Sequence, residues 1–150
     1  MDLLEKIQCQ PYDLKIEIDE IHNGWMDITL VSNYAFKKYS ASYLCDPIND
    51  LLEKYTLLNE NVPYEINPFR SIINFAVIEH DLEGENIIWL LRKKEDELYI
   101  YIWENIYEIE DWLFSEFSEQ YYVDNLEEIP NLAKNLIFSI KGKMSDFTKT

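Results

Sequence analysis

Few residues in this 150-residue chain have the chemistry of a catalytic or metal site. It holds two histidines, His22 and His80, and two cysteines, Cys9 and Cys45. The chain has no Cys-x-x-Cys or His-Glu-x-x-His motif, and its three glycines cannot form a phosphate-binding loop. His80 ends a predicted strand and could act as a base, but no motif places a serine or cysteine nucleophile beside it. We therefore predict no enzyme, metal or cofactor; an enzyme using His80 or an acidic pair is the weakest alternative.

Carboxylates are the abundant polar groups. The chain has 29 Asp and Glu against 13 Lys and Arg, for a net charge of −16. Acidic pairs therefore arise by chance, and a glycosidase-type pair needs a cleft that a chain of this length seldom forms. The run Glu95-Asp96-Glu97 does not match a calcium loop and is typical of a hairpin tip. The charge excludes general nucleic-acid binding and disfavours anionic membranes, because both would repel the chain.

Acids and aromatics interleave most densely in residues 104–128, which hold nine acids and no base. One interpretation is a solvated helix whose aromatic side chains face the core. The other is a negative docking surface for a basic protein, with Tyr and Trp as apolar anchors. On that hypothesis the partner-binding residues are Glu104, Tyr107, Glu108, Glu110, Asp111, Trp112, Glu116 and Glu119.

The first half of the chain predicts a hairpin and a helix. Apolar and polar residues alternate over 13–21 and again over 25–32, and Asn23-Gly24 between them suits a type I′ turn. Residues 33–45 predict a loop and a short strand. Asp46-Pro47 then predicts a helix start that ends by Asn61. The apolar side of this helix is formed by Ile48, Leu51, Leu52, Tyr55 and Leu58.

The second half predicts a loop, three strands and two helices. The expected loop spans 62–69, and the expected strands are Ser71 to His80, Ile87 to Arg92 and Leu98 to Glu104. Apolar residues four apart then predict helices that carry Ile109, Leu113, Phe117 and Tyr121, and, over 131–146, Leu132, Leu136, Ile140 and Met144. Together these elements predict one α+β domain over residues 1–150, an antiparallel sheet of about five strands with two to three helices packed on one face.

The predicted strand 98–104 offers an alternative function. Tyr99, Tyr101 and Trp103 share one of its faces and could line a pocket for a small molecule or a peptide. As the last strand of the sheet it could also pair edge to edge and form a dimer. Oligomeric state is otherwise open.

Two segments resemble known proteins. Tyr43-Leu44-Cys45-Asp46-Pro47-Ile48-Asn49-Asp50-Leu51-Leu52 and Glu83-Gly84-Glu85-Asn86-Ile87-Ile88-Trp89-Leu90-Leu91-Arg92 resemble a helix start and a Trp-bearing hairpin in a loose group of small bacterial proteins. More broadly, the chain resembles immunity proteins of bacterial toxin systems. That resemblance implies a cytoplasmic α+β protein that neutralises a basic nuclease toxin by covering its active site. The absence of a secretory signal or an apolar membrane segment, and the use of cysteine, favour the same compartment.

Overall fold

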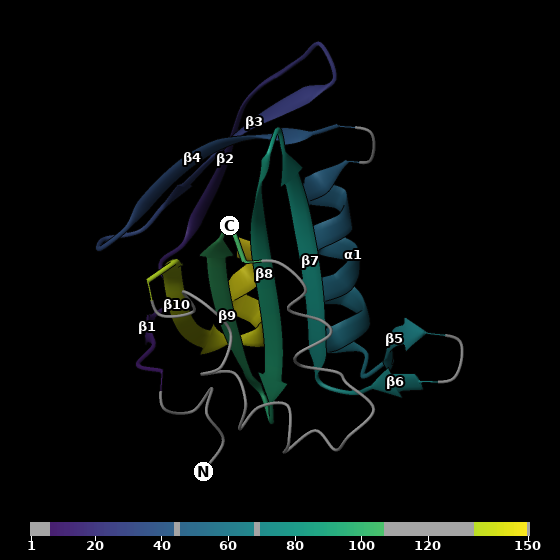
Figure 1. Ribbon diagram of the computed structural model, residues 1–150. Coiled ribbons are helices and arrows are strands. Elements are labelled where there is room, and N and C mark those ends of the chain that lie inside the picture. Colours follow the sequence, from purple (N-terminus) through teal and green to yellow (C-terminus); the bar gives the residue numbers. More distant parts are fainter. Residues whose placement is uncertain (1–6, 44–45, 68–69, 107–133, 150) are drawn as a thin grey trace.

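The computed structural model describes residues 7–43, 46–67, 70–106 and 134–149 (Figure 1). In this part of the chain there are three sheets, one α-helix and one short 3-10 helix. The five-stranded sheet has the order β1-β10-β9-β8-β7, the three-stranded sheet β2-β3-β4, and a small ribbon pairs β5 with β6. Three of the strands, β1, β5 and β6, span Gln10–Pro11, Tyr64–Asn67 and Arg70–Ile72.

The predicted first hairpin is confirmed. Strands β2 (Lys15–His22) and β3 (Trp25–Val31) pair antiparallel, with His22 opposite Trp25. Asn23 and Gly24 in the turn have φ of 48° and 84°, the positive values that a type I′ turn requires. A bulge between Ile18 and Glu20 shifts the register by one residue further along β2.

Residues 33–45 form more regular structure than predicted. Strand β4 (Phe36–Ser42) pairs with β3 along its whole length, from Phe36 opposite Val31 to Ser42 opposite Trp25. Its inner residues Tyr39 and Ala41 are buried, whereas polar Lys38 and Ser40 alternate with them and are exposed. The sequence pattern of this strand is weak, because only one of its faces packs against the core and few of its residues are apolar.

The helix α1 (Pro47–Asn59) begins and ends close to the predicted residues. Asp46 caps it, since its Oδ1 accepts hydrogen bonds from the amides of Ile48 and Asn49 at 3.0 and 3.1 Å. Leu51, Tyr55 and Leu58 are buried as expected, but Leu52 is 46% exposed and lies outside the apolar face. The helix packs against β7 and β8 (Figure 1).

The long hairpins of the main sheet follow the sequence pattern closely. Strands β7 (Phe75–Leu82), β8 (Glu85–Lys94) and β9 (Glu97–Glu104) pair antiparallel in chain order. The single strand predicted from Ser71 is interrupted, because Asn74 has φ 71° and separates β6 from β7. The predicted loop 62–69 likewise contains β5, which pairs with β6.

The helix predicted over 131–146 is wrong. Residues Leu136–Lys143 form strand β10, antiparallel to β9, with Ile140 opposite Ile100. Residues four apart in sequence also lie on one face of a regular strand, so the same spacing fits both structures. Phe138 and Ile140, two residues apart in β10, are both fully buried. A short 3-10 helix η3 (Met144–Lys149) follows. The helix predicted around Ile109 to Tyr121 lies outside the described residues.

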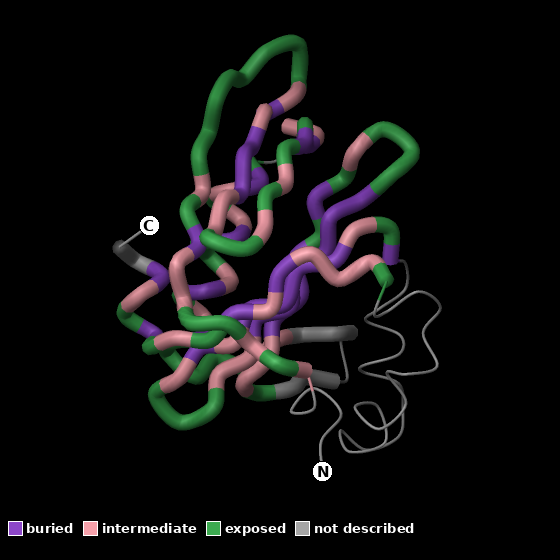
Figure 2. The backbone as a smooth tube through the Cα atoms, turned by 90° about the vertical axis from the view of Figure 1, so that its left-hand side faces the viewer, coloured by how far each residue is buried: buried purple, intermediate pink, exposed green. Residues whose placement is uncertain are grey.

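The predicted fold class is therefore also wrong. The described chain is mostly β-strand with one α-helix, rather than a sheet carrying two to three helices. Strands β3 and β4, together with α1 and η3, cover one face of the main sheet, a role that the prediction gave to helices. Figure 2 shows the buried residues along the middle of the two large sheets and the exposed ones at the outer turns.

The main core lies between the five-stranded sheet and these covering elements. Its largest fully buried side chains include Trp89 and Phe138 from the sheet, with Met26, Ile28 and Leu30 from β3. A second cluster on the opposite face of the sheet contains Val77, Ile88, Leu90, Tyr101, Trp103 and Ile106. Strand β8 contributes to both clusters, which explains why Ile87 to Leu91 is continuously apolar.

Candidate binding surface

Among the strands of seven or more residues in the two large sheets, β2 is the most exposed. Among the described residues it pairs only with β3, so its other edge carries backbone groups without a strand partner. All its residues except Ile16 are exposed. Free edges of this kind are the places where a sheet can accept a strand from another chain.

The outer face of the three-stranded sheet is acidic. Glu17 lies opposite Thr29 and Glu20 opposite Asp27, and residues that pair directly share a face. Asp19, at the bulge, joins them because its Oδ2 accepts a hydrogen bond of 2.6 Å from Thr29 Oγ1. We call these four residues, Glu17, Asp19, Glu20 and Asp27, the acidic face.

The opposite face of β2 is apolar where it extends past the core. Ile18 and Ile21 lie across from Ile28 and Met26, which are buried, yet Ile18 is 49% exposed and Ile21 51%. The core therefore ends at β3, and the outer strand leaves two large aliphatic side chains in contact with water. Exposed aliphatic groups next to a free edge favour an interaction surface.

Two lysines share the outer face with the four carboxylates, since Lys15 lies opposite Val31 and Lys38 opposite Thr29, and Lys38 acts electrostatically on Asp27. Lys37, Lys141 and Lys54 form ion pairs elsewhere, with Glu104 at 2.7 Å, Glu97 at 3.2 Å and Asp50 at 3.3 Å. Within the described ranges, no lysine or arginine forms an ion pair with any of the four carboxylates. Among the described residues, four carboxylates against Lys15 and Lys38 therefore leave this face with an excess of negative charge.

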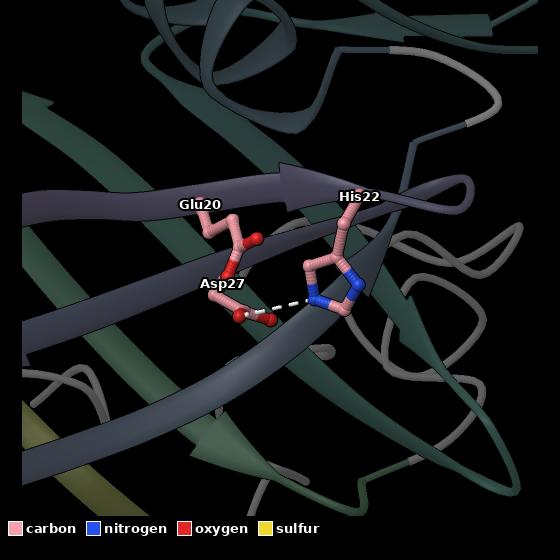
Figure 3. A group of neighbouring side chains, drawn as sticks. All are labelled: Glu20, His22 and Asp27. Atoms are coloured by element: carbon pink, nitrogen blue, oxygen red, sulfur yellow. Dashed lines mark hydrogen bonds and ion pairs between the residues drawn. The ribbon is translucent and has the colours of Figure 1, made fainter.

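One end of the acidic face brings three metal-type ligands together. Glu20, His22 and Asp27 each place a ligand atom within 4.8 Å of the other two. Figure 3 shows the three side chains lying side by side on the β2–β3 hairpin. His22 Nε2 lies 3.2 Å from Asp27 Oδ2, and Ser40 Oγ donates a hydrogen bond to Asp27 Oδ1. The hydrogen bond from Ser40, aided by His22, lowers the pKa of Asp27, so its carboxylate stays ionised at neutral pH.

The sequence pattern alone did not predict this cluster, because His22 belongs to no metal-binding motif. The signal was available in the register: a two-residue Asn23-Gly24 turn pairs His22 with Trp25, which places Glu20 opposite Asp27.

The partner-binding residues predicted from sequence fall mostly outside the described part. Tyr107, Glu108, Glu110, Asp111, Trp112, Glu116 and Glu119 all lie outside the described residues. Glu104 is described: its side chain is 39% exposed, and its carboxylate pairs with Lys37 of β4. That ion pair links the main sheet to the three-stranded sheet, so Glu104 has a partner within the chain.

His80 is a buried, fully hydrogen-bonded core residue. It is 2% exposed; its Nδ1 lies 2.9 Å from Tyr39 Oη and its Nε2 3.0 Å from the Pro47 carbonyl oxygen. This arrangement fits a neutral ring in which Nε2–H donates to Pro47 and Nδ1 accepts from Tyr39. Burial lowers its pKa to about 4. With both nitrogens engaged, His80 joins β7 to β4 and to the start of α1 rather than facing a substrate.

The aromatic face of β9 is largely enclosed. Tyr101 and Trp103 are 1% and 0% exposed and stack with ring centroids 5.9 Å apart, while Tyr99 keeps partial exposure beneath the Lys141 ammonium. The three rings therefore do not form one open surface. Strand β9 also lies between β8 and β10, so it is not the edge through which a dimer was predicted.

Comparisons with known proteins do not extend these observations. No family model, curated protein or solved structure matches the chain. In the described residues, no helix has the length and apolar character needed to cross a membrane. Of the two cysteines, Cys9 is a free thiol, and Cys45 lies outside the described residues.

Proposed function

We propose that this protein is a non-catalytic binding protein that docks a basic protein partner on strand β2 in the cytoplasm. The observation that carries the proposal is the acidic face beside a free strand edge, with no described lysine or arginine paired to it. The resemblance to immunity proteins gives the specific form: the partner is a nuclease toxin, neutralised by occlusion.

The charge of the chain supports a basic partner over a second copy. A net charge of −16 makes two copies repel one another, and their acidic faces would meet if the β2 edges paired. A cationic strand would instead bring lysine or arginine side chains opposite Glu17 and Glu20. Complementary fields of this kind accelerate association and suppress wrong partners.

The geometry supports docking by strand addition. The partner strand would complete the backbone hydrogen bonds at the edge of β2 and cover Ile18 and Ile21 on one face. On the other face, carboxylates would pair with the cationic groups that a nuclease uses to hold phosphate. The bulge near Asp19 fits the same purpose, because a bulged, charged edge resists indiscriminate pairing.

The test uses the full chain and a labelled peptide of alternating lysine and valine as the probe. We expect saturable binding by fluorescence anisotropy that weakens about tenfold or more between about 50 and about 300 mM NaCl, because salt screens exposed charges. A peptide with glutamate in place of lysine should not bind. Amide chemical-shift changes should concentrate in residues 15–22.

Paired variants separate the acidic face from net charge. Glu17→Gln/Glu20→Gln should lower the affinity for the peptide about fivefold or more, because each exposed charge pair contributes a few tenths to about 1 kcal/mol. The matched control Glu53→Gln/Glu60→Gln removes the same charge from exposed positions on α1 and beyond its end, and should bind almost as wild type does. Equal weakening by both variants, or shifts centred away from β2, would overturn the proposal.

A further inference from the structure

We propose that Glu20, His22 and Asp27 form a binding site for a divalent transition-metal ion, with Zn²⁺ as the ion that best fits the ligand set. The three ligand atoms already lie within 4.8 Å of one another on the outer face of the β2–β3 hairpin (Figure 3). This site shares Glu20 and Asp27 with the acidic face, but metal binding there does not require that a basic strand docks.

The closest pair of ligand atoms already has the spacing that a bound ion needs. Zinc bonds to imidazole nitrogen and carboxylate oxygen are about 2.0–2.1 Å, so two ligands at a tetrahedral angle stand about 3.3 Å apart. The distance between His22 Nε2 and Asp27 Oδ2 is 3.2 Å. An ion can therefore enter between them, replacing their direct hydrogen bond, without a change of backbone. Glu20 is exposed, so its side chain has room to turn toward the ion.

Surrounding groups hold the ligands Glu20 and Asp27 in place. The type I′ turn at Asn23-Gly24 fixes the cross-strand register that puts Glu20 opposite Asp27. Ser40 Oγ, on the third strand, orients the Asp27 carboxylate from behind. Hydrogen bonds to a ligating carboxylate of this kind strengthen metal sites, because they reduce the ligand freedom lost on binding.

The ligand types select among ions. One imidazole with two carboxylates suits Zn²⁺ and its first-row neighbours, and leaves a fourth position for water. Calcium takes six to eight oxygen ligands, and Mg²⁺ prefers an octahedral set of oxygens, so both are disfavoured here. The net charge of −16 also raises the local concentration of any cation at this face.

The experiment is a calorimetric titration of the full chain with Zn²⁺ alone. We expect one Zn²⁺ site, which EDTA empties. The affinity for Zn²⁺ should fall about tenfold or more in His22→Gln. It should fall about tenfold in Ser40→Ala, the range typical of a residue that orients a ligand. Cys9→Ser tests the free thiol, and the Glu53→Gln/Glu60→Gln variant tests net charge; both should bind Zn²⁺ as wild type does.

A spectroscopic readout locates the ion. The imidazole resonances of His22 should shift on addition of Zn²⁺, whereas those of buried His80 should not. Unchanged affinity in His22→Gln, or loss of binding in Cys9→Ser, would overturn the assignment. So would the absence of any binding by the wild-type chain. The lysine–valine peptide assay is run with EDTA present, so failure of the metal site and failure of the docking proposal give separate results.

Discussion

Acidification should destabilise the fold through His80. Its side chain is buried with a pKa of about 4, against 6.5 for an unperturbed histidine. Between these two values the unfolded chain binds a proton that the folded chain does not, so stability falls as the pH is lowered. The loss starts near pH 6.5 and is complete below about pH 4. Asp50 and Asp81, the acidic groups that act on the ring, favour its charged form but do not offset burial.

The magnitude follows from the two values. From about pH 7.5 to about pH 5, binding of one proton to the unfolded state alone lowers the free energy of unfolding by about 2 kcal/mol, and the full difference of 2.5 pKa units is worth about 3 kcal/mol. The assay is urea unfolding followed by tryptophan fluorescence at each pH. Repulsion among the 29 acids also varies with pH, so the comparison is made between variants.

Two variants isolate the histidine. His80→Gln should lower the free energy of unfolding by about 1–3 kcal/mol at neutral pH, because it breaks a buried pair of hydrogen bonds. It should also remove the contribution of His80 to the dependence of stability on pH. Tyr39→Phe should also lose stability but keep the slope, because the ring stays buried and ionisable. If wild type and His80→Gln show the same slope from about pH 7.5 to about pH 5, the reasoning is refuted. A His80 resonance that titrates near pH 6.5 would refute it as well.

Two further predictions concern backbone positions. Gly142→Ala should lower stability by about 1–3 kcal/mol in a thermal melt, because the added Cβ would lie 2.6 Å from Tyr12 Cβ; an unchanged melting temperature would contradict this close approach. Asp46→Ala should cost about 1 kcal/mol by removing the cap of α1, and Asp46→Ser should restore most of it; equal losses in both variants would show that the cap hydrogen bond is not the cause.

Local signals in the sequence predicted the elements that local chemistry determines. The Asn23-Gly24 turn and the Asp46-Pro47 cap fix their own backbone conformations, so the hairpin and the helix were both correct. Gly84, between the predicted strands that end at His80 and begin at Ile87, lies in a turn with φ of 76°, a conformation that glycine adopts readily. Strand β8 was predicted because burial on both faces leaves an unbroken apolar run.

Elements that depend on distant partners were not predictable. Strand β10 spaces its apolar residues as a helix would, and only pairing with β9 decides between the two. Strand β4 has a polar face, so its pattern was weak. Of the candidate binding surface, the sequence showed the acids but not that Asp19 and Glu20 share a face, because a bulge changes the alternation between them.

The position of β10 has a consequence for synthesis of the chain on the ribosome. Residues 136–143 lie between β1 and β9 in the sheet, yet they are made last of the three, and Ser139 bonds to the carbonyl of Gln8, 131 residues earlier. Until they emerge, β9 presents an open edge that carries Tyr101 and Trp103. Nascent chains that stall before residue 136 therefore expose an aromatic strand edge, the kind of surface that chaperones cover and that aggregates first.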